Sequence, residues 1–172
     1  WLMMQFHISP DTISEPEDYP DDLQKFMSEN AITPQGLIES KYDLSILKKH
    51  NIVMAANGHV FRNDVEGFLP KILRKMFADR QKYKKLYIAA KKEVEQLKHA
   101  GKDTSAAEQK VTMYNLLQLC KKVCLNSCYG ATGTPYFRYF DIRQAVAVTL
   151  SGQYAIKYME KNLNTYFRSV TD

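Results

Sequence analysis

The chain has 172 residues, of which 45% are hydrophobic and 25% are charged. This is enough for a hydrophobic core, but no uncharged apolar run is long enough to cross a membrane. Three cysteines at four-residue spacing, Cys120, Cys124 and Cys128, do not form the even-numbered pattern of a disulfide framework, and we expect them to be small core residues along one helix face.

The formal net charge of +5 is concentrated in the middle third of the chain. From Trp1 to Pro70 there are 5 lysine or arginine and 11 aspartate or glutamate residues, a balance of −6. From Lys71 to Lys122 the counts are 14 and 5, a balance of +9, and the remaining residues contribute 5 and 3, a balance of +2. Such a basic block is either a solvated helix face or a surface that binds a polyanion, and composition leaves both alternatives open.

Residues 1–66 have the composition of an acidic, irregular segment. Short helices are expected at about 21–29 and 34–51. Farther on, Asn57-Gly58 stands between two short apolar runs, which is a strong hairpin signal because both turn positions need positive φ. The pattern predicts two short antiparallel strands near 52–62.

Residues 67–129 predict two long helices. Apolar residues recur at three- and four-residue steps from Leu69 to Leu97, as in an amphipathic helix of about 30 residues, and Gly101 suits its C-terminal end. A second helix is expected to begin near Ser105, after N-cap residues. Because the connection is so short, the two helices must run antiparallel.

Residues 130–172 predict a third long helix. The run from Tyr129 to Pro135 is expected to break the preceding helix, and the new helix is expected from about Asp141 to Phe167. Asp141 itself is expected to be a helix N-cap or an ion-pair partner of Arg143. The predicted fold class is mainly α with a small β-hairpin (α+β), built around a long antiparallel helical hairpin.

The hairpin geometry brings four polar residues to one level. Arg80 lies 21 residues before Gly101 and Lys122 lies 21 residues after it, while Lys84 and Asn126 each follow one turn later at i+4. Three cations and an amide in one patch suit a triphosphate. Lysine-rich helices often produce such coincidences, so a non-enzymatic basic helical hairpin that binds nucleic acid remains the alternative.

One motif favours the triphosphate site over the alternative of a general nucleic-acid-binding hairpin. Lys122–Gly130 has the form K-x-x-x-N-S-x-Y-G and resembles the second conserved motif of family B (alpha-like) DNA polymerases, of the tailed-bacteriophage type. The resemblance runs in order from about residue 6 to 168. It is carried also by Ile8–Ile13, by Gly67–Pro70 with Asp79–Lys84, by Ala131–Gly133 and by Phe137–Arg143. It implies a fingers region between the first and third palm motifs: palm-derived segments at 1–66 and 130–172, the second with a palm-associated helix, and the fingers hairpin at 67–129.

The resemblance also implies roles for the four polar residues. Arg80 is similar to the fingers arginine that contacts the incoming triphosphate, and Lys84 to a second basic group near it. Lys122 resembles the motif lysine, which contacts phosphate and is the candidate catalytic proton donor to the leaving pyrophosphate. Asn126 resembles the amide that also reaches the triphosphate of the dNTP.

Two further residues are implied to contact the nascent base pair: Tyr129 on its minor-groove side, and Gly130, which would let the backbone turn tightly against it. The family uses two Mg²⁺ ions held by D-x-x-S-L-Y-P and D-T-D motifs, and neither string occurs in this sequence. The implied chain is a fragment or split subunit of a DNA-directed DNA polymerase with a partial polymerase fold, inactive alone. Its expected partners are primer–template DNA, dNTP and the remaining palm, thumb and exonuclease segments, in the cytoplasm of a cell or phage host, without membrane attachment.

Overall fold

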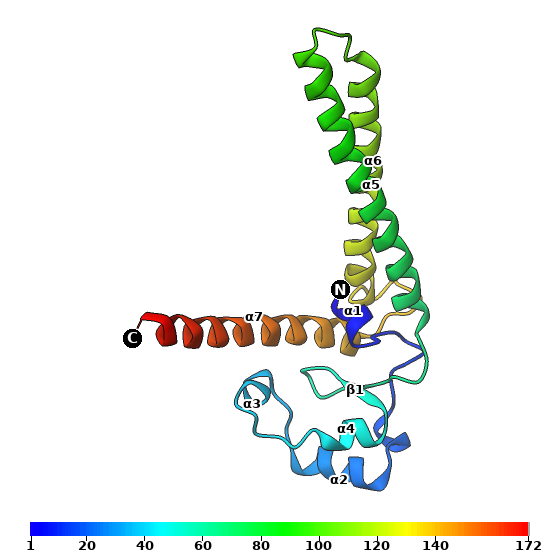
Figure 1. The fold of residues 1–172 in the computed structure, drawn as a ribbon. Coiled ribbons are helices and arrows are strands. Elements are labelled where there is room, and N and C mark those ends of the chain that lie inside the picture. Colours follow the sequence, from blue (N-terminus) through cyan, green and yellow to red (C-terminus); the bar gives the residue numbers. More distant parts are fainter. Residues whose placement is uncertain (172) are drawn as a thin grey trace. The chain divides into compact units, whose positions relative to one another are not determined.

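The structure, a computed structural model, describes residues 1–171, with side chains through residue 170. It is mainly α with one small antiparallel sheet, which confirms the predicted fold class (Figure 1). Two compact units are distinct: Trp1–Lys71 with the segment from Ala131 onward, and Ile72–Gly130. The elements are α1 (Leu2–Gln5), the 3-10 turn η1 (Pro16–Asp18), α2 (Asp21–Glu29), α3 (Pro34–Ile38), α4 (Ser45–Lys49), β1 (Ile52–Met54), β2 (Val60–Arg62), α5 (Phe68–His99), α6 (Ser105–Thr132) and α7 (Ile142–Thr171).

The helix expected at 21–29 is found as α2, but the single helix expected at 34–51 is wrong. Two short helices, α3 and α4, stand there instead. The chain turns back after α3, where Ser40 has a positive φ of 55° and the Lys41 amide donates to the Gly36 carbonyl at 3.0 Å. The Asp43 carboxylate then accepts from the Ser45 amide at 2.9 Å, which starts α4.

The predicted hairpin is present, with Met54 opposite Val60 in antiparallel register. Its loop is longer than the expected two-residue turn. The Ala55 amide donates to the His59 carbonyl at 2.9 Å, and within the loop only Gly58 has a positive φ, at 82°. The Asn57-Gly58 pattern therefore predicted the position of the chain reversal correctly, but it did not predict the type of turn.

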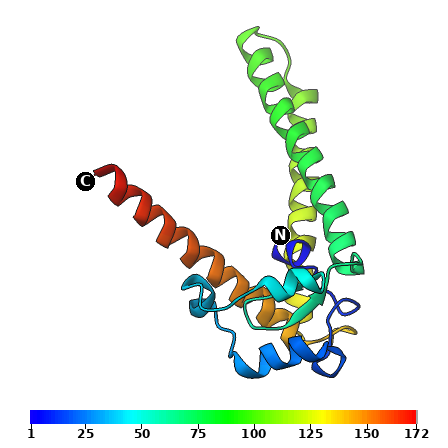
Figure 2. The ribbon, with the colours of Figure 1, turned by 60° about the horizontal axis from the view of Figure 1, so that its bottom comes forward.

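The hairpin loop is tied to the start of α7. The buried Ala56 amide donates to the Ser151 hydroxyl at 3.1 Å, and the Asn57 side-chain amide donates to the Arg143 carbonyl at 3.1 Å. Figure 2 shows the segments from α1 to β2 gathered along the N-terminal part of α7. Tyr19, Leu23, Met54 and Val60 from these segments form a hydrophobic core. The partly buried residues that pack against this core are Phe26, Met27, Ile32, Leu37, Ile46, Leu47 and Ile52.

Arg143 joins two distant acidic residues. Its Nη1 and Nη2 donate to the two carboxylate oxygens of Glu15 at 2.7 and 2.9 Å, and its Nε donates to Asp141 Oδ1 at 3.0 Å. Asp141 Oδ1 also accepts from the Arg143 amide at 2.9 Å. Asp141 is thus both the N-cap of α7 and an ion-pair partner of Arg143, and both expected alternatives are confirmed.

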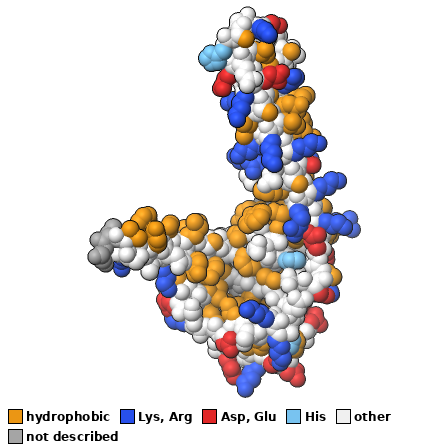
Figure 3. Space-filling view, viewed as in Figure 1, with side chains coloured by type: hydrophobic (Ala, Val, Ile, Leu, Met, Phe, Trp, Pro, Cys, Tyr) orange, Lys and Arg blue, Asp and Glu red, His pale blue; other side chains and the backbone are white. Residues whose placement is uncertain are grey.

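The C-terminal part of α7 carries an uncovered row of apolar side chains. Every residue from Ile156 to Val170 is exposed. Spacings of three and four residues put a row of them on one helix face, which we call the apolar α7 stripe (Figure 3); it consists of Ile156, Met159, Leu163, Tyr166 and Val170.

The second unit holds the predicted antiparallel helical hairpin, formed by α5 and α6. Gly101 closes α5 with a φ of +64°. Its amide donates to the Lys98 carbonyl at 3.1 Å and the Lys102 amide donates to the Leu97 carbonyl at 3.0 Å, which is the Schellman arrangement. The Asp103 carboxylate then accepts from the Ser105 amide at 3.0 Å and starts α6.

One expectation about α6 is confirmed and two are wrong. The helix ends at Thr132, within the run expected to break it, but Gly130 lies inside the helix without a positive φ and does not form the expected tight turn. The cysteines do not all serve as core residues, because Cys120 and Cys124 are exposed and only Cys128 is half-buried. Apolar residues of α6 lie both on the face that packs against α5 and on the exposed face. The composition of the helix therefore does not indicate which face is buried.

Replacing Gly101 by alanine is expected to lower the free energy of unfolding by about 1–2 kcal/mol, because a Cβ strains a left-handed backbone. Urea unfolding followed by circular dichroism measures the change. Gly130→Ala is the matched control, since this glycine is helical and an added Cβ meets no atom within 4 Å. Equal stabilities of the two variants would contradict the assigned role of Gly101.

The Glu15–Arg143 contact predicts a pH dependence. The hydrogen bond from Arg143 lowers the pKa of Glu15 below its ordinary value of 4.5. Burial acts to raise the pKa of Asp141, but hydrogen bonds from Arg143 outweigh it and the net shift is downward. A carboxylate with a lowered folded-state pKa stabilises the fold above its ordinary pKa and loses that contribution as the pH falls through the lowered value.

Glu15→Gln is therefore expected to be less stable than the wild type at pH 7. The difference should shrink as the pH falls below 4.5 and through the lowered pKa of Glu15, which unfolding curves at a series of pH values will show. A difference that stays constant from pH 7 to acid would contradict the ion-pair explanation.

Candidate functional site

The face along which α5 and α6 pack, here called the seam, follows a heptad-like spacing. It is apolar near the Gly101 connection and becomes cationic at one level toward the opposite end, the base of the hairpin; beyond that level Phe77, Leu125 and Cys128 are again half-buried. At the cationic level Arg80 and Lys121 continue the spacing from the two helices, and both are half-buried. The positions nearer the connection are Tyr83, Tyr87, Ala90, Val94 and Leu97 on α5 and Ala107, Val111, Tyr114 and Gln118 on α6.

A single ion pair joins the helices at the cationic level within the described residues. Lys121 Nζ lies 2.9 Å from Asp79 Oδ2, and the two side chains are 31% and 39% exposed. The hydrogen bond to Lys121 lowers the pKa of Asp79, and the same bond raises the pKa of Lys121. Sequence analysis did not single out this pair, although opposite charges at nearly equal distances from Gly101 could have signalled it.

Arg80 has an unsatisfied donor. Its Nε is buried and has no hydrogen-bond partner within residues 1–171. Burying an unpaired polar group is costly, so such a group is either strained or directed at a partner that the chain itself does not supply. Arg80 thus differs from the neighbouring Asp79, whose carboxylate is used within the hairpin.

The other three predicted polar residues are all exposed. Lys84 follows Arg80 by one turn on α5, and Lys122 and Asn126 lie one turn apart on α6. Within the part of the chain that the structure describes, none of them forms an ion pair or a side-chain hydrogen bond. Because their side chains are exposed, these donors are open to solvent.

The ion pair fixes the side to which the next residue on each helix projects. One α-helical step turns by about 100° and rises about 1.5 Å. Because the helices are antiparallel, these turns have opposite senses when viewed from one end. The steps from Asp79 to Arg80 and from Lys121 to Lys122 therefore turn in the same direction across the hairpin: Arg80 stays half-buried in the seam, and Lys122 projects out of the seam on the side toward which Arg80 is turned.

Tyr129 and Gly130 lie on the last turn and a half of α6. The Tyr129 side chain is 40% exposed. Around Gly130, an added Cβ would meet no atom of the chain within 4 Å. This stretch of α6 is thus accessible, and at Gly130 the backbone itself is uncovered.

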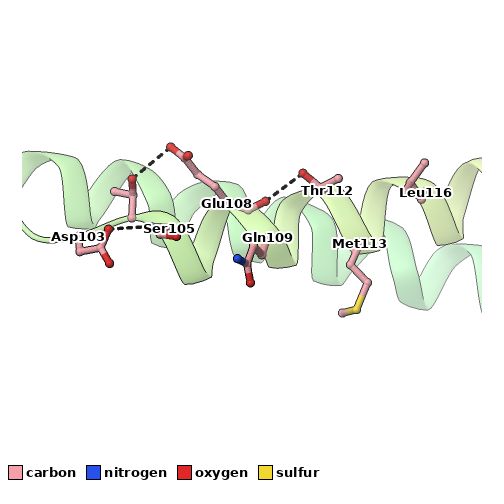
Figure 4. Close-up of a pocket in the computed structure, with 8 residues that line it drawn as sticks. Asp103, Ser105, Glu108, Gln109, Thr112, Met113 and Leu116 are labelled. Carbon is pink, nitrogen blue, oxygen red and sulfur yellow. Dashed lines mark hydrogen bonds between the residues drawn. The ribbon is translucent and has the colours of Figure 1, made fainter.

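A shallow groove of about 720 Å³ lies at the other end of the hairpin, away from these residues. It is lined by Asp103, Thr104, Ser105, Glu108, Gln109, Thr112, Met113 and Leu116 (Figure 4). Thr104 Oγ1 donates to Glu108 Oε1 at 3.2 Å and Thr112 Oγ1 donates to the Glu108 carbonyl at 3.1 Å. Its carboxylates make it unsuitable for a phosphate, so the groove and the cationic level are separate features.

Among residues 1–171, histidine, cysteine, aspartate and glutamate side chains do not gather in threes as a metal site requires. The described residues therefore do not fit a pair of divalent ions. Each described helix also falls short of the apolar length that a bilayer crossing requires.

Comparisons with known proteins agree on one family. The family model of DNA polymerase family B matches residues 2–171. The chain is 28% identical over 150 residues to the DNA-directed DNA polymerase of Enterobacteria phage T4, and 27% identical over 150 residues to that of Escherichia phage RB69. Each alignment covers 66% of this chain and 17% of the phage protein.

A third similar protein comes from another virus. The chain is 29% identical over 111 residues to a DNA polymerase of Orf virus (strain NZ2), covering 64% of this chain and 10% of that protein. The chain thus spans less than a fifth of the length of these relatives.

Proposed function

Because the chain belongs to DNA polymerase family B, we propose that it is the fingers region, with adjoining palm segments, of a DNA-directed DNA polymerase. In this role the hairpin of α5 and α6 binds the triphosphate of the incoming dNTP and contacts the nascent base pair. The main support is the Asp79–Lys121 register, which directs Arg80 and Lys122 to one side of the hairpin.

The proposed triphosphate ligands supply complementary chemistry. Arg80 offers a planar guanidinium whose terminal nitrogens can bind phosphate oxygens through two donors. Lys84 and Lys122 add mobile point charges, and Asn126 adds a neutral amide donor. Together they neutralise charge and orient the nucleotide.

Lys122 has a second proposed role. Its ammonium is exposed and unpaired within residues 1–171, so it can hold a proton beside the phosphates. Donating that proton to the leaving pyrophosphate would make Lys122 a catalytic general acid. Two divalent ions supply the family's remaining phosphoryl-transfer chemistry, and the described residues offer no ligand set for them.

Tyr129 and Gly130 are proposed to face the nascent base pair. The exposed Tyr129 ring provides a flat surface, and the uncovered backbone at Gly130 permits close approach. The chain would then select and position the nucleotide for palm, thumb and exonuclease segments that act on primer–template DNA in the cytoplasm. Alone it is expected to give no primer extension.

Arg80→Ala and Lys122→Ala in the polymerase that contains this segment are each expected to raise the KM for dNTP. Losing one charged hydrogen bond costs about 1.5–3 kcal/mol, or roughly 10- to 100-fold in kcat/KM. Steady-state primer extension measures both constants. Lys92→Ala, which removes an exposed lysine two turns beyond Lys84 on the same helix, is the matched control and should change neither.

An unchanged KM in Arg80→Ala and Lys122→Ala would contradict the proposed site. The alternative is a basic hairpin that binds nucleic acid without selecting a nucleotide, favoured by the +9 balance of residues 71–122. In that case Lys92→Ala would weaken DNA binding about as much as Lys122→Ala. Scrambling residues 126–130 would then leave DNA affinity intact.

Gly130→Ala separates a role in the fold from a role at the base pair. An added Cβ meets nothing within the chain and favours the helix, so the free energy of unfolding should stay equal or rise by up to about 1 kcal/mol. Single-nucleotide incorporation should nevertheless fall by about 10-fold or more, since a methyl group would intrude on the base pair. Incorporation at the wild-type rate would remove Gly130 from the proposed site.

A further inference from the structure

At the level of the proposed site, the seam contains like charges that repel each other. Arg80 and Lys121 both occupy half-buried seam positions, so two cations meet where the rest of the seam is largely apolar. Like charges in a partly desolvated layer repel each other and force packed helices apart. Asp79 is the carboxylate that the hairpin places there, 2.9 Å from Lys121.

Other inter-helix ion pairs lie nearer the connection and are more exposed. Lys110 Nζ lies 3.1 Å from Glu93 Oε1, and Lys98 Nζ lies 3.2 Å from Glu108 Oε1. Their side chains are 45% exposed or more, against 31% and 39% for Lys121 and Asp79. Because screening weakens exposed pairs, the pair at the base has the strongest influence on the register of the hairpin.

The same ion pair makes the two consecutive lysines, Lys121 and Lys122, different in their surroundings. Lys121 and Lys122 differ by one residue, yet Lys121 is tied to Asp79 while Lys122 is exposed and unpaired within residues 1–171. Without Asp79, Lys121 would lose its counter-charge beside Arg80, and the two helices would be free to slip. A slip of one turn moves a side chain by about 5.4 Å along the helix axis and would change the distance between Arg80 and Lys122.

We propose that Asp79 is a positioning residue for nucleotide binding: through its ion pair with Lys121 it holds α5 and α6 in the register that presents Arg80 and Lys122 together. This inference rests on the proposed function. It adds a residue that does not touch the nucleotide and acts only through Lys121. It assigns the pair to substrate alignment as well as to helix packing.

The test compares variants in the polymerase that contains this segment. Asp79→Asn keeps the size of the side chain and removes its charge. It should raise the KM for dNTP about 5- to 10-fold and change kcat less than 2-fold. Glu93→Gln, which breaks an ion pair of the same kind nearer the connection, is the matched control and should leave both constants unchanged.

A charge reversal distinguishes positioning from simple loss of stability. Lys121→Asp alone should raise the KM as Asp79→Asn does, whereas Asp79→Lys combined with Lys121→Asp should restore it to within about 2-fold. Melting temperatures are measured alongside. A raised KM that the double variant rescues supports positioning, whether or not the melting temperatures of the single variants fall. A lowered melting temperature with unchanged KM, or a double variant as impaired as the single ones, overturns it.

Arg80→Ala and Lys122→Ala are measured in the same series. If both raise the KM and Asp79→Asn does not, the inference about Asp79 fails while the proposed function stands. If none of the three changes the KM, the proposed function itself fails.

Discussion

Antiparallel register is the constraint on which the helical hairpin depends. Residues far apart in sequence lie at the same height in the hairpin only when the connection and the packing along the seam place the two helices in the same register. The Schellman end at Gly101 and the bond from the Ser105 amide to the Asp103 carboxylate set the reversal within a few residues. The Asp79–Lys121 pair then fixes alignment some 30 Å away, at about 1.5 Å per residue over 20 residues or so.

The other unit solves a different problem, because its elements are short. Helices of five to nine residues are not stable alone and need tertiary anchors. α7 supplies them: Ser151 and the Arg143 carbonyl bind the hairpin loop, and the Arg143 guanidinium reaches Glu15 across 128 residues of sequence. Lys161 adds a bond from its ammonium to the Ile38 carbonyl, at the end of α3.

Local sequence signals predicted much of this arrangement. The three long helices, the reversal at Gly101, the strand pair and both roles of Asp141 follow from periodicity, capping and turn chemistry. The failures occurred where tertiary contacts override local preference. Gly130 was expected to form a tight turn, yet α6 continues past it and ends at the buried Thr132, whose carbonyl accepts from the Asp141 amide at 3.3 Å.

The candidate site was only partly predictable for the same reason. Equal distances from Gly101 suggested that Arg80 and Lys122 share a level, because an antiparallel pair has a simple symmetry. Whether Lys121 or Lys122 forms the ion pair depends on the rotation of each helix about its axis, and residue spacing does not give this rotation. The Asp79–Lys121 contact supplies it, and spacing alone would have treated Lys121 and Lys122 as equivalent.

The apolar α7 stripe makes the thermodynamics of this chain depend on its surroundings. Fully covering a large apolar side chain contributes about 1.5–3 kcal/mol, so covering the whole stripe is worth on the order of 10 kcal/mol. That is comparable with the entire folding free energy of a typical domain. By linkage, a partner that covers the stripe only in the folded chain would raise the unfolding midpoint of the chain.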